Sequence, residues 1–194
     1  MVNCPALLLY SLLGLLAQTL ALRAEQLLSL PEAQKLCFTN ATRFDEVKVG
    51  LTRDDIKSIE AAAGAKVKNP EPKVWSAWQN TKPLGTLWFD QVIGKHELID
   101  YVVAISLDGK VAQVEIVEYR EHYGGQVRGR TWLGQFKGKT PQEPFKLGSD
   151  IHNISGATMS CRHVTEGVKR VLATFQQVRS RLPGDGGAGL SDKL

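Results

Sequence analysis

The chain has 194 residues, of which 43% are hydrophobic and 23% charged. These values are ordinary for a globular protein and exclude a wholly disordered, collagen-like or coiled-coil chain. Lysine and arginine number 24 against 20 acidic residues, and no long basic run accompanies this small excess, so nucleic acid is not an expected partner. Three cysteines without a CxxC pair indicate neither a disulfide scaffold nor a zinc or iron–sulfur centre.

The N-terminal segment predicts export. Residues 6–22 are nearly all apolar, and small residues follow them, which is the pattern of a secretory signal. Two polar residues interrupt the run, which is short for a membrane span. We therefore expect residues 1–24 to be a signal peptide cleaved after Ala21 or Ala24, with an uncleaved anchor as the alternative. The mature protein is then periplasmic or otherwise exported.

Two cysteines remain after such a cleavage, Cys37 and Cys161. An oxidising compartment permits a disulfide between them. Two separate buried thiols are the alternative, and the sequence leaves both open.

Two helices are expected in the N-terminal part of the mature chain. Ser29 is placed to cap a short helix that has Pro31 near its start. Thr52 and Asp55 have the spacing of a capping box for a second helix, which Gly64 is expected to end.

Strands are expected next. Three prolines surround the stretch VWSAWQ, which predicts an edge strand at residues 74–79. Further strands are predicted at residues 84–93, 99–106 and 111–119. Asp108-Gly109 between the last two predicts a hairpin, one side of which is expected to be buried. We therefore assign residues 25–83 to an N-terminal helical extension with an edge strand.

The C-terminal half is predicted to contain a loop-rich segment at residues 121–150 and a last helix from about His163 to Arg181. The apolar stripe of this helix consists of Val164, Val168, Val171, Leu172, Phe175 and Val178. The tail at 182–194 is predicted to be disordered. The expected fold class is α+β, an antiparallel sheet with packed helices, and the expected domain is 84–181.

One motif before the last helix favours a ligand. Small residues in the stretch 153–160 let the backbone approach a ligand closely. Free amides at the start of a helix, together with the helix dipole, favour an anion such as phosphate. The simpler and commoner arrangement is an N-cap made by Ser155, Thr158 or Ser160, with Gly156 shaping the turn.

This motif resembles that of a known family. Ser155-Gly-Ala-Thr158, with Ser160 and a Val-Thr-x-Gly-Val helix after it, is similar to the FMN-binding domain family. That family includes the flavin-carrying subunits of sodium-pumping and Rnf-type respiratory complexes and related periplasmic proteins. Blocks at residues 92–97, 108–111 and 119–124 resemble the family's upstream blocks in the same order, so the resemblance covers about residues 84–175.

The resemblance implies FMN as cofactor, an FMN-binding-domain-like fold, and a phosphoester link to Thr158 made by a separate flavin transferase. It implies these cofactor-binding residues: Ser155, Gly156, Ala157, Thr158, Ser160, Arg120, His96 and Glu97. The chain differs from the family at His152, where an acidic residue is usual, and Asp150 lies two residues further back. Covalent and non-covalent FMN therefore both remain open.

The remaining candidates have simpler explanations. The four histidines lack the spacing of metal ligands. Arg120 is the best cation for the phosphate or the flavin ring, and the alternative is an ordinary solvated arginine at a strand end. Trp88 is expected in the core, whereas Trp132 is left open between the core and the flavin.

The function that follows from the resemblance is an exported electron carrier rather than a stand-alone enzyme. It is expected to act in an extracytoplasmic or membrane-associated redox chain, with a membrane-bound protein as redox partner. The alternative is a non-redox periplasmic binding or assembly module of the same fold that has lost the flavin.

Overall fold

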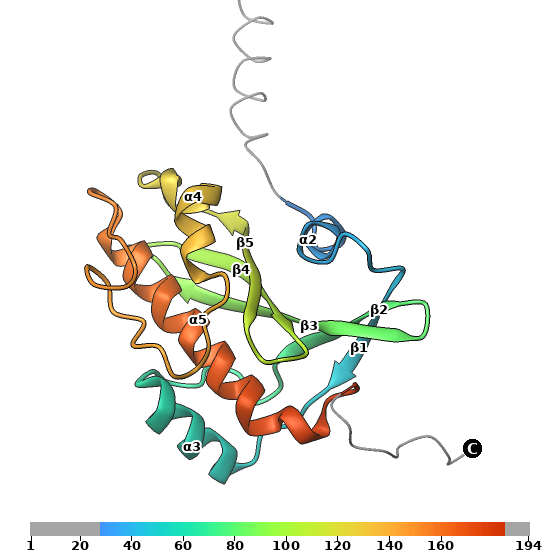
Figure 1. Ribbon diagram of the computed structural model, residues 1–194. Coiled ribbons are helices and arrows are strands. Elements are labelled where there is room, and N and C mark those ends of the chain that lie inside the picture. The colour runs from blue at the N-terminus through green and yellow to red at the C-terminus, as the bar shows by residue number, and fades with distance from the viewer. Residues whose placement is uncertain (1–27, 185–194) are drawn as a thin grey trace, which may run out of the picture.

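The computed structural model describes residues 28–184, so the predicted signal peptide and the tail beyond residue 184 lie outside the described residues. One antiparallel sheet forms the centre, with its strands in chain order (Figure 1). The strands are β1 (Arg43–Lys48), β2 (Lys73–Gln79), β3 (Lys82–Ile93), β4 (Leu98–Ser106) and β5 (Val111–Tyr119). The predicted α+β class and the hairpin at Asp108-Gly109 are confirmed.

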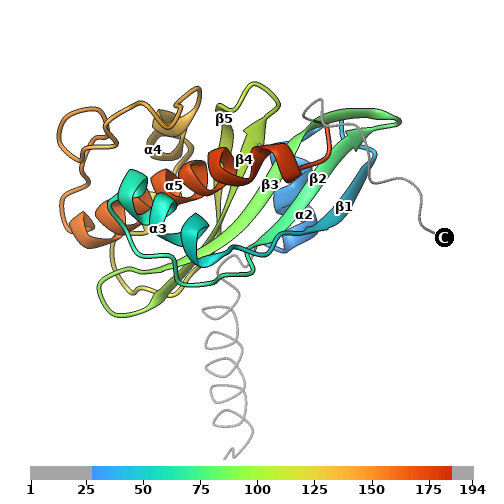
Figure 2. The same ribbon diagram turned by 90° about the horizontal axis from the view of Figure 1, so that it is seen from below.

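Helices cover both faces of this sheet. They are α2 (Leu30–Cys37), α3 (Arg53–Ala63), α4 (Arg130–Leu133) and α5 (Thr158–Val178), with short 3₁₀ turns at 125–128, 134–136 and 179–181. Figure 2 shows α5 and α3 on one face and α2 on the other. Within residues 28–184, no helix has the length and apolar character needed to cross a membrane.

The predicted caps at the N-terminal helices are confirmed. Ser29 and Glu32 form a capping box at the start of α2. At the start of α3, the Asp55 amide donates to Thr52 Oγ1 at 3.1 Å, and the Thr52 amide donates to Asp55 Oδ2 at 2.9 Å. Gly64 ends α3 in the left-handed conformation, with φ of 69°.

Residues 74–79 form a strand as predicted, within β2, but the prediction that this strand lies at the edge of the sheet is wrong. β1 pairs with β2 along its whole length, from Arg43 opposite Trp78 to Lys48 opposite Lys73. The sequence of β1, RFDEVK, has only two apolar residues, so its periodicity was too weak to predict a strand. The expected domain start at residue 84 lies inside β3. The strands before it and the strands after it belong to one sheet.

Both sides of the central hairpin are buried, where only one was expected. Tyr101 and Val103 of β4 pack in the cluster under α5, while Val102 and Ala104 pack in the cluster under α2. The second cluster exists because α2 closes the far face of the sheet. The sequence did not show this because α2 lies more than sixty residues before β4.

A β-bulge in β5 changes which face of the sheet its side chains point to. Ala104 pairs with Gln113 and Ile105 pairs with Val111, so Ala112 is an extra residue on β5. Val111 therefore packs in the α5 cluster together with Val114, whereas strict alternation along a regular strand would place these two residues on opposite faces.

The two cysteines are free, buried thiols on opposite faces of the sheet. Cys37 lies in the cluster under α2, and Cys161 lies in the cluster under α5. The sheet between them rules out the disulfide that the sequence permitted. Burial, with a smaller contribution from Glu115, raises the pKa of the Cys37 thiol to about 12.

The last helix begins at Thr158, five residues before the expected start at His163. Its apolar stripe is buried as predicted. Gly167 allows close packing on the sheet, because a Cβ there would lie 2.1 Å from Tyr101 Oη. The helix ends at Val178, and a 3₁₀ turn continues to Arg181.

Asp55 connects α3 to the end of α5. Gln177 Nε2 donates to its Oδ1, and Arg181 Nη2 donates to its Oδ2, both at 2.9 Å. Hydrogen bonds from Gln177, Thr52 and Arg181 hold the pKa of this 7% exposed carboxyl group well below its usual range. Asp55 is therefore ionised wherever the protein is folded near neutral pH.

We predict that Asp55→Asn lowers the free energy of unfolding at pH 7 by about 1–2 kcal/mol, because it weakens a helix cap and a charge-assisted link. A carboxyl group with a depressed native pKa stabilises above the unfolded value of about 3.9 and loses this contribution as pH falls below it. The difference from wild type should therefore narrow between about pH 4 and pH 2. Urea denaturation at several pH values measures it.

The matched control is Asp54→Asn, which removes the same charge from a side chain that is 93% exposed and 3.7 Å from Lys57. It should change stability little at any pH. A loss equal for both variants, or independent of pH, would contradict the assigned role of Asp55.

Candidate functional site

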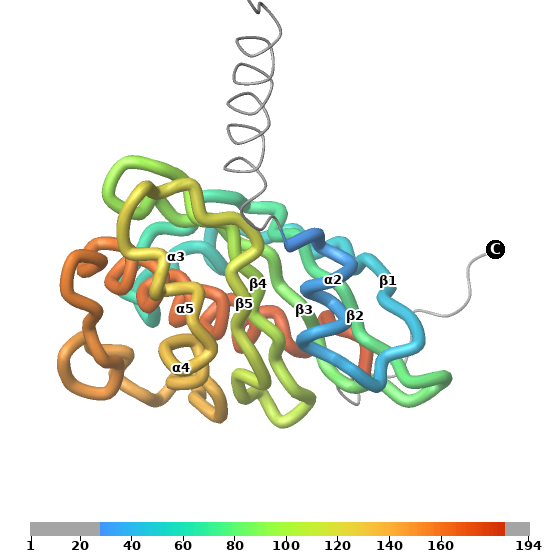
Figure 3. Tube along the Cα trace, turned by 90° about the horizontal axis from the view of Figure 1, so that it is seen from above, coloured from blue at the N-terminus to red at the C-terminus, as the bar shows by residue number. Residues whose placement is uncertain are grey.

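Three segments distant in sequence meet around a pocket of about 580 Å³. They are the β3–β4 turn, the segment after β5 and the start of α5, and Figure 3 shows the first two side by side. The pocket is lined by Lys95, His96, Glu97, Glu121, His122, Tyr123, Gly156, Ala157, Thr158, Met159 and Ser160. Its volume lies within the range of small-molecule sites, roughly 300–1,000 Å³.

The start of α5 has no side-chain cap. Ala157 is the N-cap residue, so the interpretation in which Ser155, Thr158 or Ser160 caps the helix is wrong. The first bonded amide of the helix is that of Cys161, which donates to the Ala157 carbonyl at 2.9 Å. The amides of residues 158–160 have no acceptor within the described part of the chain. These unpaired donors border the pocket, where the helix dipole also favours an anion.

The hydroxyl groups of Thr158 and Ser160 differ in their hydrogen bonds. Tyr119 Oη donates its one proton to the Tyr123 carbonyl at 2.7 Å, so the 3.2 Å contact between Ser160 and Tyr119 requires Ser160 as donor. Thr158 Oγ1 instead accepts from Asn153 Nδ2 at 3.0 Å, and its own proton has no acceptor within residues 28–184. Thr158 therefore has the hydroxyl that is available to a ligand.

Glu121 holds the β3–β4 turn against the pocket. Its Oε1 accepts from the amides of His96 at 2.6 Å and Glu97 at 3.1 Å. Burial works against ionisation of Glu121, but the amides of the turn outweigh it and keep its pKa below the usual value. The ionised carboxylate thus places His96 and Glu97 at the pocket wall.

His163 attaches the same turn to α5. Its Nδ1 contacts the carbonyl oxygens of Ile93 and Gly94, the second at 3.1 Å. Because both partners accept, Nδ1 must have the proton. The turn is therefore fixed from two sides, by Glu121 and by His163.

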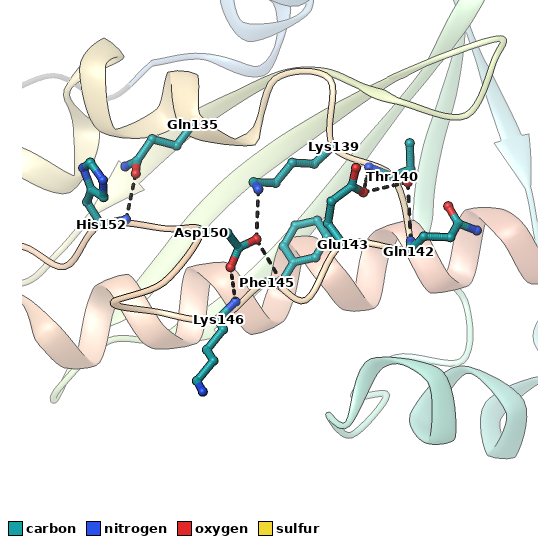
Figure 4. A network of polar contacts seen from close by, with 9 residues as sticks. All are labelled: Gln135, Lys139, Thr140, Gln142, Glu143, Phe145, Lys146, Asp150 and His152. Atoms are coloured by element: carbon teal, nitrogen blue, oxygen red, sulfur yellow. Dashed lines mark hydrogen bonds and ion pairs between the residues drawn. The ribbon is translucent and has the colours of Figure 1, made fainter.

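Asp150 organises the loop that leads to the motif (Figure 4). Its Oδ1 accepts from the Lys146 amide at 2.6 Å, and its Oδ2 accepts from Lys139 Nζ at 2.9 Å and the Phe145 amide at 3.2 Å. Asp150 is thus committed to this loop and does not replace the acidic residue that the family usually has at position 152.

His152 is fixed through its backbone. Its amide donates to Gln135 Oε1, and its carbonyl accepts from Trp132 Nε1, both at 2.7 Å. The imidazole is exposed and does not line the pocket. Trp132 is buried, with Phe136 packed edge-on against it, so the indole left open by the sequence is a core residue.

Most of the expected site residues come together. His96, Glu97, Gly156, Ala157, Thr158 and Ser160 line the pocket. Ser155 is exposed next to Gly156 and does not line it. Arg120 lies elsewhere: its Nη2 contacts Asp100 Oδ2 at 2.9 Å and Glu118, so it is neither a pocket cation nor an ordinary solvated arginine.

The pocket is also lined by residues that the sequence did not single out as site residues: Lys95, Glu121, His122, Tyr123 and Met159. Lys95 was within reach, because it lies inside the block at residues 92–97. Glu121, His122 and Tyr123 lie inside the block at residues 119–124, and Met159 lies inside the stretch 153–160, so they too were within reach. Within the described residues, no group of histidine, cysteine, aspartate and glutamate side chains is arranged to hold a metal ion.

Gly124 sets the distance between the segment after β5 and the motif. It has φ of +79°, and a Cβ there would lie 2.5 Å from Ala157 Cβ. We predict that Gly124→Ala destabilises the protein more than Gly138→Ala does, by about 1–3 kcal/mol, because only the first adds a clash.

Gly138 is the matched control, since its φ is +81° and no atom lies within 4 Å of an added Cβ. In both variants the alanine is held in the left-handed conformation, which costs about 1–2 kcal/mol. The difference between the two losses of stability is therefore the cost of the clash at position 124. Denaturant unfolding of the two variants gives the difference. Equal losses of stability in the two variants would show that position 124 requires glycine only for its backbone conformation.

Comparison with known proteins agrees with this geometry. The fold is similar to that in the crystal structure of NqrC from Shewanella oneidensis, with a TM-score of 0.50, 20% sequence identity, and coverage of 74% of this chain and 72% of that one. No curated protein sequence matches the chain. Residues 94–173 match the FMN-binding domain family, and they include every residue that lines the pocket. Residues 94–173 of this chain therefore form an FMN-binding domain.

Proposed function

We propose that this protein is an exported flavoprotein that binds FMN with its phosphate at the first turn of α5 and carries electrons to or from a protein partner. One observation supports this most strongly: three unpaired amides and the Thr158 hydroxyl border the same pocket. The family match supports FMN as the ligand.

The residues of the pocket fit such a cofactor. The amides of residues 158–160 and the ammonium group of Lys95 suit a phosphate, and the volume of about 580 Å³ accommodates a larger body. FMN, when bound, supplies the redox chemistry, while the protein supplies position and electrostatics. Tyr123 is 84% exposed and Met159 is 39% exposed at this pocket, so a partner protein has access to a bound flavin.

A covalent link would form at Thr158. Its hydroxyl is at the first helical position, beside the unpaired amides, and its proton has no protein acceptor within residues 28–184. A flavin transferase would move the FMN group from the pyrophosphate of a flavin dinucleotide to this oxygen. The phosphoester that the family resemblance implies forms, the P–O–P bond breaks, the nucleoside monophosphate leaves and the hydroxyl proton is released. The free amides would then stabilise the charge that remains on the phosphate.

We predict that Thr158→Ala abolishes in-gel flavin fluorescence under denaturing conditions after co-expression with a flavin transferase. The fold should stay intact, because the change removes one hydroxyl group at a helix start. Thr158→Ser should retain part of the fluorescence, since a hydroxyl remains. Ser155→Ala is the matched control, because Ser155 is exposed and lies outside the pocket.

Two other outcomes have definite meanings. Flavin that is bound but released by denaturation from the wild type would reject the covalent link and keep the FMN site. Wild-type protein that stays colourless after co-expression and binds no added FMN in calorimetry would reject the proposed function. It would favour the binding or assembly module without flavin, and His152→Asp would then test whether one acidic residue restores the cofactor.

A membrane-bound redox partner is the partner we infer. The family includes flavin-carrying subunits of respiratory complexes, and this chain has the fold of NqrC. The pocket shows no paired nucleophile and general base, so a carrier or subunit is favoured over a stand-alone enzyme.

Export is the last part of this proposal, and it is supported by the apolar segment at residues 6–22. We predict that mass spectrometry of the protein from its natural compartment finds an N-terminus near Leu22 or Glu25. An intact Met1 on a soluble cytoplasmic protein would reject export and leave the FMN site unaffected.

A further inference from the structure

A second pocket lies further along α5. It has a volume of about 320 Å³ and is bounded by the connection between α3 and β2, by β3 and by the middle of α5. It shares no lining residue with the pocket at Thr158. Arg170 lies twelve residues after Thr158, about 18 Å along a helix that rises 1.5 Å per residue. The two pockets are therefore separate sites.

A buried arginine forms part of its wall. Arg170 is 7% exposed, and its Nη2 donates to Asp90 Oδ2 at 2.6 Å, which is the one hydrogen bond of its side chain within residues 28–184. A guanidinium group has five N–H donors, so most of those of Arg170 have no protein acceptor. They are not sealed in the core, because the only fully enclosed polar side-chain atoms without a partner in the described chain belong to Ser76 and Trp78. These donors are thus available to the pocket.

One oxygen of the Asp90 carboxylate already accepts two hydrogen bonds. Its Oδ2 accepts from the Tyr101 hydroxyl as well as from Arg170. Burial raises the pKa of Tyr101 well above its usual value, so this hydroxyl keeps its proton. Asp90 therefore neutralises one positive charge and requires no further cation from a ligand.

Two more cations belong to the same wall. Lys68 and Lys73 are exposed and form no ion pair within the described residues, and Lys73 Nζ lies 5.4 Å from the centre of the Phe89 ring. With Arg170 they give three positive charges against the single negative charge of Asp90. A pocket with this excess attracts anions and repels cations.

The rest of the wall is apolar, with Val67, Trp88, Phe89 and Val171 among its residues. We propose that this pocket binds a small organic carboxylate, with the carboxylate at Arg170 and the lysines and an aromatic or branched aliphatic body against the apolar wall. Burying the body provides the hydrophobic part of the affinity, and the guanidinium group provides the orientation. The site is independent of the flavin.

The test is calorimetric titration of the full mature protein with 1-naphthoate and with the neutral 1-naphthamide. One naphthoate should bind per protein at least tenfold more tightly than naphthamide, which corresponds to about 1.4 kcal/mol. Saturating FMN should leave the naphthoate Kd unchanged, because the two pockets share no residue.

Charge reversal tests the wall directly. Lys68→Glu with Lys73→Glu should weaken naphthoate binding at least tenfold and leave naphthamide binding unchanged. Lys82→Glu with Lys146→Glu, at two exposed lysines outside the pocket, makes the same change in net charge and should have no such effect. Because all four lysines are exposed, unfolding is not expected; Lys68→Gln with Lys73→Gln repeats the test without added negative charge. Absent naphthoate binding, equal affinity for both probes, equal effects of the two double variants, or competition by FMN would each overturn the proposal.

Discussion

The packing of α5 on the sheet is the constraint on which the rest of the structure depends. Gly167 brings the helix to contact Tyr101 without an intervening side chain, and Tyr101 and Arg170 both hydrogen-bond to Asp90. Since removing one partner of a buried ion pair leaves an uncompensated charge, this arrangement strongly favours one register of α5 on β3 and β4. That register in turn decides where Thr158 lies, because the helix is continuous from Thr158 to Val178.

The elements that precede residues 94–173 support the packing of α5 on the sheet. α3 holds the far end of α5 through Asp55, and α2 closes the opposite face of the sheet over Val102 and Ala104. β1, β2 and β3 all precede residue 94 and continue the sheet of the FMN-binding domain, and the buried residues of β2 and β3 belong to the same clusters as β4 rather than to a separate core. The N-terminal region is thus part of the fold that positions the site, and removing it would expose one whole face of β4.

The sequence predicted well the features that depend on residues close together in the chain. The Thr52–Asp55 capping box and the Asp108-Gly109 turn each involve neighbours in sequence, and both are confirmed. β1 was missed because its sequence is mostly charged, and the bulge at Ala112 because strict alternation does not reveal an extra residue. At the site, Gly156 and Thr158, which the motif selected, both line the pocket. Arg120 was misplaced because its partner Asp100 lies on the adjacent strand, a relation that only the register shows.

The uncapped start of α5 contrasts with the starts of α2 and α3. α2 and α3 both begin with a reciprocal capping box, whereas α5, the longest helix of the described chain, begins with Ala157 and no side-chain cap. Replacing a good N-cap with alanine costs about 1 kcal/mol, so the start of α5 is less stable than a capped start would be. Such a local loss is expected where a ligand supplies the missing hydrogen bonds. A ligand that binds the folded state alone also stabilises it by RT ln(1 + [L]/Kd), and an anion at this turn would therefore return the stability that the missing cap removes.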